Sequence, residues 1–205
     1  MKKLKLKKTT LTTVITIIAI VIAYFVMNTL NNSGVLSNVM SGLLVRICVW
    51  SIMAVSLNLV VGILGELSLG HAGFMYVGAF TGSLFTQITA DMISNDLLRF
   101  VIGILIGAVT AAIFGILIGS AVLRLQGDYL AIVTLAFGEI IKGILGTVIV
   151  AFDSKGFHFS LNNTTDLIGK GVKSEDIIVK GSQGILKIQR SSTFLIGIIL
   201  LIITV

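Results

Sequence analysis

Long apolar runs separated by shorter polar links make up most of this chain. The runs cover about 11–30, 42–64, 69–89, 100–123, 129–151 and 193–205. A helix of about twenty apolar residues crosses the hydrocarbon core of a bilayer, which is about 30 Å thick. The pattern therefore predicts an all-α integral membrane protein, built as a multi-span helical bundle.

The last apolar run and the polar loop before it give two further predictions. The sixth run, 193–205, is too short to cross a bilayer, so we expect a span that is cut short and a single, incomplete transmembrane domain over 1–205. The preceding polar loop, 152–192, ends in DIIVKGSQGILKIQR. Two β-prone segments flank its Gly-Ser-Gln-Gly centre, which predicts a small β-hairpin outside the bilayer.

The distribution of charged residues orients the N-terminus but does not decide the side on which the 152–192 loop lies. Five lysines precede the first run, and basic residues beside a span favour a cytoplasmic N-terminus. Five spans would then place the 152–192 loop outside, although that loop carries six Lys and Arg residues. A re-entrant third run, 69–89, would instead place the loop inside. Charge alone leaves both topologies open.

The stretch 62–82, GILGELSLGHAGFMYVGAFTG, interrupts the apolar pattern. It contains six glycines together with Glu66, Ser68 and His71. Polar groups and irregular backbone are tolerated at membrane depth only where protein or a water-filled cavity covers them. These three side chains are therefore candidates for lining a substrate pathway. The alternative is that they cap two helix ends at the membrane surface.

Glu139 is a further candidate for the pathway, because it lies near the middle of the fifth run. Ionisable groups at this depth usually face a bundle interior or a wet cavity. Lys142 follows three residues later on the same helical face, so the two charges also fit a purely structural ion pair. We favour the structural pair and keep the pathway role open.

The fourth run carries a ridge of small residues at every fourth position. Its members are Gly103, Gly107, Ala111, Gly115 and Gly119. Such small-xxx-small spacing lets the backbones of neighbouring helices approach closely. We predict a helix-packing seam here, without chemistry of its own.

Composition excludes several function classes. Hydrophobic residues make up 56% of the chain and charged residues only 12%, whereas soluble domains average about 25% charged. The net charge of +6 is concentrated in the N-terminal lysines and gives no sign of nucleic-acid binding. The single cysteine, Cys48, gives neither a disulfide nor a metal pair, and we expect no metal or cofactor. No phosphate-binding loop or hydrolase motif occurs, so any ATP hydrolysis belongs to another chain.

Three sequence blocks together resemble a known family. They read SLNLVVGILGELSLGHAGF over 56–74, LRLQGDYLAIVTLAFGEII over 123–141 and GSQGI over 181–185. The first resembles the signature of branched-chain amino-acid ABC transporter permeases. The second and third are similar to the M-type (LivM-like) members. The extra sequence over 169–180 and the missing coupling loop depart from the family pattern.

The resemblance implies a function and a set of partners. A permease of this kind spans the cytoplasmic membrane of a prokaryote several times, with its N-terminus inside and the 152–192 loop outside. It pairs with a second, homologous permease and two cytoplasmic ATPases, and an extracytoplasmic binding protein delivers the solute. The implied activity is import of branched-chain amino acids by alternating access, with no catalytic residue in this chain.

Three other functions fit the same sequence features. A related permease would carry another small solute, such as urea or a short amide. A membrane scaffold would use the small-residue ridge for assembly and would transport nothing. An ion-coupled secondary transporter, which we favour least, would work without ATP.

Overall fold

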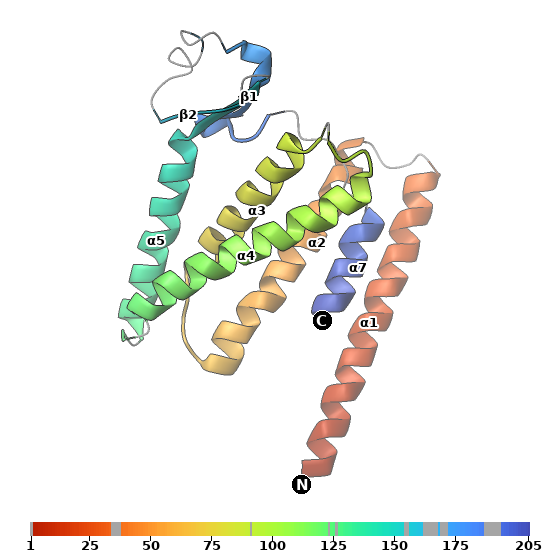
Figure 1. Ribbon diagram of the computed structural model, residues 1–205. Helices are drawn as coiled ribbons and strands as arrows, with labels where there is room; N and C mark the ends of the chain where they lie inside the picture. The colour runs from red at the N-terminus through yellow and green to blue at the C-terminus, as the bar shows by residue number, and fades with distance from the viewer. Residues whose placement is uncertain are drawn as a thin grey trace. The chain divides into compact units, whose positions relative to one another are not determined.

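The computed structural model describes residues 2–33, 38–90, 92–122, 124–125, 127–153, 156–161, 168, 172–186 and 194–205. These residues are mostly helical, with a small three-stranded antiparallel sheet, which confirms the predicted fold class (Figure 1). The chain divides into two compact units, which are described separately. The first is Met1–Leu64 with Ser192–Val205, and the second is Gly65–Ser191.

Helices long and apolar enough to cross a membrane number four among the described residues. The apolar segments are Thr13–Leu30, Gly42–Leu64, Asp96–Val122 and Asp128–Thr147. Phe194–Thr204 is apolar but shorter. The helix His71–Ile88 is not among the four, because its histidine, glutamine, glycines and threonines lower its mean hydropathy. A span over 69–89 therefore stays a prediction, as does its re-entrant alternative.

The first unit consists of three packed helices. They are α1 (Lys2–Asn32), α2 (Asn38–Asn58), which continues as the π-helix η1 (Leu59–Leu64), and α7 (Phe194–Thr204). The short α7 packs against both longer helices. A Cβ atom added at Gly197 would lie 3.2 Å from the Cβ of Cys48 in α2. The rings of Phe194 in α7 and Tyr24 in α1 stack with their centroids 5.5 Å apart. Cys48 is thus a buried packing residue.

The second unit contains three helices and the sheet. Its elements are α3 (His71–Ile88), α4 (Asp96–Val122), α5 (Asp128–Thr147), β1 (Ile149–Asp153), β2 (Gly156–Ser160), β3 (Ile177–Lys180) and the 3₁₀ helices η2 (Ser174–Asp176) and η3 (Gly181–Gln183). Helix α3 packs against α4 along most of its length and also against α5 (Figure 1). It is therefore the element that holds this unit together.

Four glycines, Gly78, Gly82, Gly103 and Gly107, bring α3 and α4 into backbone contact. We call them the glycine interface. A Cβ atom added at Gly82 would lie 2.7 Å from the carbonyl oxygen of Gly103, and one added at Gly107 would lie 2.5 Å from that of Gly78. The pairing of 78 with 107 and 82 with 103 shows that the two helices run antiparallel. Only glycine fits such an approach without moving the backbones.

The rest of the ridge on α4 has different surroundings. Ala111 lies at the margin of the glycine interface, 3.5 Å from a Cβ atom added at Gly78. Cβ atoms added at Gly115 and Gly119 meet nothing within 4 Å in the described part of the chain. The periodic ridge therefore separates into a half that contacts α3 and a half without a neighbour among the described residues.

Helix α5 ends at Thr147, earlier than the 151 boundary that the apolar run indicated. Ile149, Val150 and Ala151 belong instead to β1. A short apolar run rich in β-branched residues suits a buried strand as well as a helix, and periodicity does not separate the two. The end of the fifth predicted span, 129–151, therefore differs from the helix boundary.

The sheet has the order β2-β1-β3 and is antiparallel throughout. The β1–β2 hairpin was not predicted. The predicted hairpin around Gly181 corresponds to β3, the η3 turn and Ile185, which forms an isolated bridge with Val179. Residues 187–190 of that segment lie outside the described residues. A cluster of Val148, Val150 and Val179 packs the sheet against Phe80 of α3.

Candidate solute pathway

The helical backbone breaks at Gly65, within the glycine-rich stretch. The π-helix η1 ends at Leu64, and α3 begins at His71. Gly65 has a φ of 75°, in the left-handed region that glycine adopts without strain. Residues 65–70 have neither helical nor strand structure, and we call this segment, together with His71 at the start of α3, the linker. Irregular backbone next to an apolar helix of membrane length points to a cavity or a protein-covered position.

The linker is attached to α5 through Leu69 and Gly70. The backbone N–H of Leu69 donates a hydrogen bond to Oγ1 of the buried Thr134, at 3.2 Å. Thr134 in turn donates to the carbonyl oxygen of Ala131, at 3.0 Å. A Cβ atom added at Gly70 would overlap the backbone carbonyl oxygen of Thr134. The hydroxyl and the glycine together fix where α3 begins.

The first turns of α3 continue this contact with α5. A Cβ atom added at Gly73 would lie 2.9 Å from the Cα of Gly138. The rings of Phe74 and Phe137 pack beside it, with centroids 5.1 Å apart. The start of α3 is thus held by close backbone packing, which leaves the linker's own polar side chains out of the interface.

Glu66, Ser68 and His71 are all half-buried. Within the part of the chain that the structure describes, none of these side chains forms a hydrogen bond or ion pair. The N-cap position of α3 is Gly70, and no side chain caps it. The capping alternative therefore gains no support from a hydrogen bond among the described residues.

Glu139 has a different environment from the linker residues. Its carboxylate Oε2 lies 3.6 Å from Nζ of Lys142, and both side chains are exposed. Glu139 follows Gly138 on α5, but its charge is directed to its helical neighbour. This geometry fits the structural ion pair. No group of three or more His, Cys, Asp or Glu residues that could hold a metal occurs in the described ranges.

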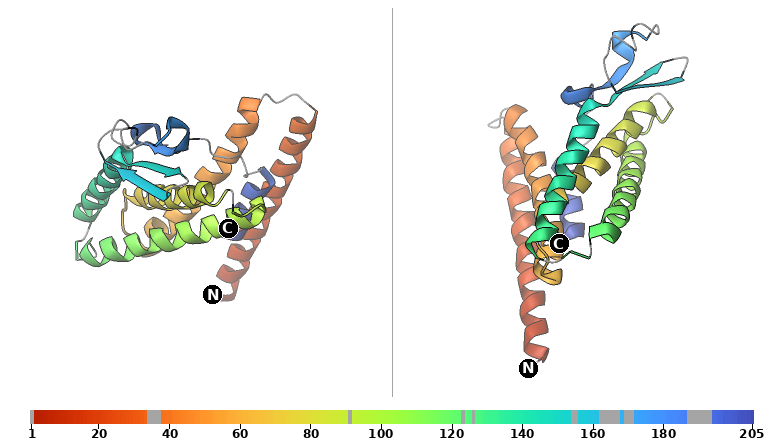
Figure 2. Two further views of the ribbon diagram at one scale, coloured as in Figure 1. Left: turned by 45° about the horizontal axis from the view of Figure 1, so that its top comes forward. Right: turned by 90° about the vertical axis from the view of Figure 1, so that its left-hand side faces the viewer.

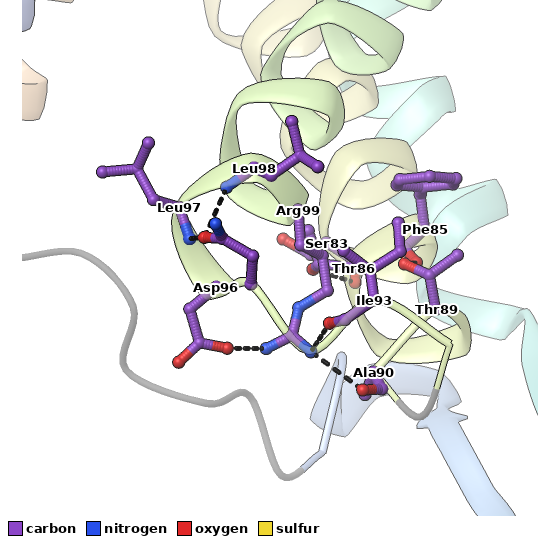
Figure 3. Close-up of polar contacts among 11 residues, drawn as sticks. Ser83, Phe85, Thr86, Thr89, Ala90, Ile93, Asp96, Leu97, Leu98 and Arg99 are labelled. Carbon is purple, nitrogen blue, oxygen red and sulfur yellow. Dashed lines mark hydrogen bonds and ion pairs between the residues drawn. The ribbon is translucent and has the colours of Figure 1, made fainter.

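Arg99 is a buried polar residue in the short stretch between the predicted runs 69–89 and 100–123. It lies in the first turn of α4 and is only 5% exposed. Its Nη1 donates to the carbonyl oxygens of Ala90 and Ile93, at 3.1 and 3.4 Å, and its Nη2 pairs with Asp96 at 2.6 Å (Figure 3). The side chain thus binds the turn between α3 and α4 to the helix that follows.

Two further polar contacts complete the α3–α4 pair. Asn95 Oδ1 accepts hydrogen bonds from the backbone N–H groups of Leu97 and Leu98, at 3.1 and 3.3 Å, which makes it the cap of α4. The hydroxyls of Thr81 and Thr110 lie 2.7 Å apart across the interface. Two features of the sequence could have indicated these contacts. The pair Asn95-Asp96 precedes an apolar run, as a helix cap does, and Thr81 and Thr110 are hydroxyl residues inside apolar runs.

Comparisons with known proteins identify the family. Residues 39–205 match the family model described as branched-chain amino acid transport system, permease component. The high-affinity branched-chain amino acid transport system permease protein LivM of Escherichia coli K12 is 43% identical over 97 residues, and that of Salmonella typhimurium LT2 is 41% identical over 97 residues. These matches cover 47% of this chain and 21% of each relative.

The chain therefore spans about a fifth of the length of the curated relatives it matches. No solved structure matches it. The family match, in contrast, extends over most of the chain, from the start of α2 to the end of α7, and includes the linker and the glycine interface. The chain belongs to the branched-chain amino acid transport permease family.

Proposed function

We propose that this chain is the membrane-spanning permease subunit of an ATP-binding-cassette importer for branched-chain amino acids. It would work in the cytoplasmic membrane of a prokaryote by alternating access. The observation that carries the proposal is the linker, an irregular segment with three polar side chains that form no bonds to described residues. Transporters commonly bind their solutes where a helix is interrupted.

The chemistry of the linker suits an apolar amino acid. The Glu66 carboxylate would attract the ammonium group of the solute. The N-terminal end of α3, with His71, would attract the carboxylate, because a helix dipole is positive at that end. Leu67 and Leu69, which are 46% and 50% exposed, would contact the aliphatic side chain.

The attachment to α5 gives the linker a role in the alternation. Leu69 bonds to Thr134 on one side of the linker, and Gly65 allows a sharp change of backbone direction on the other. A movement of α5 would therefore reorient Glu66 and Ser68. The pathway would open to one face of the membrane at a time, as alternating access requires.

The proposal includes the partners that such an importer needs. ATP hydrolysis would be performed by two cytoplasmic ATPases, because this chain carries no phosphate-binding loop. A second, homologous permease would complete the pathway. An extracytoplasmic binding protein would deliver the solute, with the N-terminus of this chain inside and the 152–192 loop outside.

Reconstitution of the full-length permease with its partner subunits tests this function. Proteoliposomes supplied with binding protein and ATP should take up labelled leucine, and isoleucine and valine should compete. Competition by urea or acetamide but not by valine would show that the substrate is a small amide and not a branched-chain amino acid. Uptake driven by an ion gradient without ATP would indicate a secondary transporter. If neither uptake nor a co-purifying ATPase is found, the result would support the alternative of a membrane scaffold that transports nothing.

A further inference from the structure

The two faces of the small sheet differ in what covers them. Val150 and Val179, which are paired in the register, lie on the face that packs against Phe80 of α3. We call this the helix-side face. Ile149 and Ala151 lie on the opposite face, where they pack with Val172 and Ile177. Side chains alternate between faces along a strand, so the faces of the other residues follow from the register.

Three phenylalanines extend the helix-side face beyond the helices. Phe152 is two residues from Val150 on β1, Phe157 is the register partner of Phe152, and Phe159 is that of Val150. All three therefore lie on the same face as Val150. They are 40%, 55% and 50% exposed, respectively. We call them the aromatic patch.

The opposite face carries the polar residues of the same strands. His158 is the register partner of Ala151, and its ring nitrogen lies 3.3 Å from the carboxylate of Asp153. Lys180 is the register partner of Ile149 and is exposed. The β1–β2 hairpin is thus amphipathic, but its exposed apolar side chains lie on the face from which the helices arrive.

The position of the sheet relative to the bilayer follows from α5. This helix has 20 residues, so it is about 30 Å long and matches the hydrocarbon core. Only Val148 separates its last residue from β1, so a bilayer crossed by α5 would have the sheet at the level of its lipid headgroups. Figure 1 and the right-hand view of Figure 2 show the strands beyond the C-terminal end of α5. The helix-side face is therefore the membrane side of the sheet.

We propose that the aromatic patch is a membrane-interface anchor, with its rings inserted between the lipid headgroups and the acyl chains. Apolar faces of interfacial elements, which carry Trp, Phe or Leu, enter this zone by about 5–10 Å. The polar pair His158–Asp153 stays on the aqueous side of the same hairpin. This anchor fixes the hairpin to the bilayer, and through Val150 and Phe80 it also fixes the C-terminal half of α3.

The lipid is the occupant that the geometry favours over a protein partner. The span that leads into the patch, α5, also has exposed apolar side chains, among them Ile140 and Ile144, which are 59% and 53% exposed. It is also directed toward the bilayer, whereas a soluble partner would approach from the polar face that carries Lys180. An apolar patch beside a span, with charges on its far side, has the arrangement of an interfacial element.

Tryptophan fluorescence in lipid vesicles tests the anchor. Trp50 is the single tryptophan of the 205 residues, so Phe157→Trp is made in a Trp50→Phe background of the whole chain. We expect phosphatidylcholine with bromines near the headgroup end of the acyl chain to quench this tryptophan more strongly than bromines near the chain terminus. Acrylamide in the water should quench it weakly.

Lys173→Trp in the same background is the matched control. Lys173 is exposed and adjoins Val172, which covers the opposite face. Acrylamide should quench this tryptophan strongly, and brominated lipid should not. Phe159→Trp repeats the measurement if the first variant fails to fold. Strong acrylamide quenching at 157 and 159 would overturn the anchor, and so would protection from both quenchers, which would mean that protein covers the patch.

Discussion

The glycine interface and the linker share a glycine-rich composition but differ in what their polar groups contact. In the glycine interface the backbones of α3 and α4 touch, and the hydroxyls of Thr81 and Thr110 bond to each other. In the linker the backbone is irregular, and Glu66 and His71 form no bond to any described residue. Glycine beside polar groups that bond to one another indicates packing, whereas the polar groups beside the glycines of the linker form no such bonds, and we propose that they contact solute.

This difference separates two roles that sequence patterns alone combine. Substitutions in the glycine interface should lower stability and reduce transport only as far as folded protein is lost. Substitutions of the linker's polar side chains should leave stability unchanged and reduce transport directly. Stability is measured for every variant as the free energy of unfolding by sodium dodecyl sulfate in mixed micelles. Uptake is measured in addition for the variants of the linker.

Gly107→Ala should have the largest effect on stability. The new methyl group would lie 2.5 Å from the carbonyl oxygen of Gly78, so the two helices must separate. Overpacking of this kind lowers the free energy of unfolding by about 1–3 kcal/mol or more. Gly115→Ala is the matched control, because its methyl group meets nothing within 4 Å of the described residues. Equal losses at the two positions would remove the distinction between the two halves of the ridge.

Arg99→Met should have the next largest effect. The methionine keeps much of the apolar stem but leaves the carbonyl oxygens of Ala90 and Ile93 without their donor. A buried acceptor left unsatisfied lowers stability by about 1–3 kcal/mol. Asp96→Asn, whose side chain is 69% exposed, should change stability by less than about 1 kcal/mol. A larger loss for Asp96→Asn than for Arg99→Met would contradict this account of the turn.

Thr81→Val and Thr110→Val should have smaller effects. Hydrogen bonds between membrane helices contribute on average about 0.6 kcal/mol each. Both hydroxyls also bond to carbonyl oxygens of their own helices, so each single variant removes more than the shared contact. A double-mutant cycle isolates the coupling between the two threonines. A coupling energy of zero would show that the 2.7 Å contact does not stabilise the interface.

The helical fold could be predicted from the apolar runs, because a membrane-spanning helix needs about 20 mostly apolar residues and such runs can be recognised in the sequence. The packing of Gly103 and Gly107 could not be separated from that of Gly115 and Gly119, because the period is the same for all four. Which of them have a partner depends on where α3 packs against α4, and this contact lies at Gly78 and Gly82. The change from helix to strand at Ile149 was hidden for a similar reason, since apolar β-branched residues suit both.

The candidate site could be predicted in part. Sequence composition identified Glu66, Ser68 and His71 because polar residues are conspicuous between apolar runs. It gave no indication that Thr134, distant in sequence, holds the linker through the N–H of Leu69. Arg99 was also placed in a link, because a charged residue at the edge of a run looks like a boundary. Its burial depends on carbonyl oxygens that only the folded turn brings together.

Transport by linker variants tests the central claim most directly. Glu66→Gln, Ser68→Ala and His71→Ala should each change the free energy of unfolding by less than about 0.5 kcal/mol, because they remove no described contact. At equal amounts of assembled complex in proteoliposomes, initial uptake of labelled leucine should fall for Glu66→Gln and His71→Ala, and remain unchanged for Gly115→Ala. Wild-type uptake by both linker variants would contradict the assignment of the linker to the solute pathway.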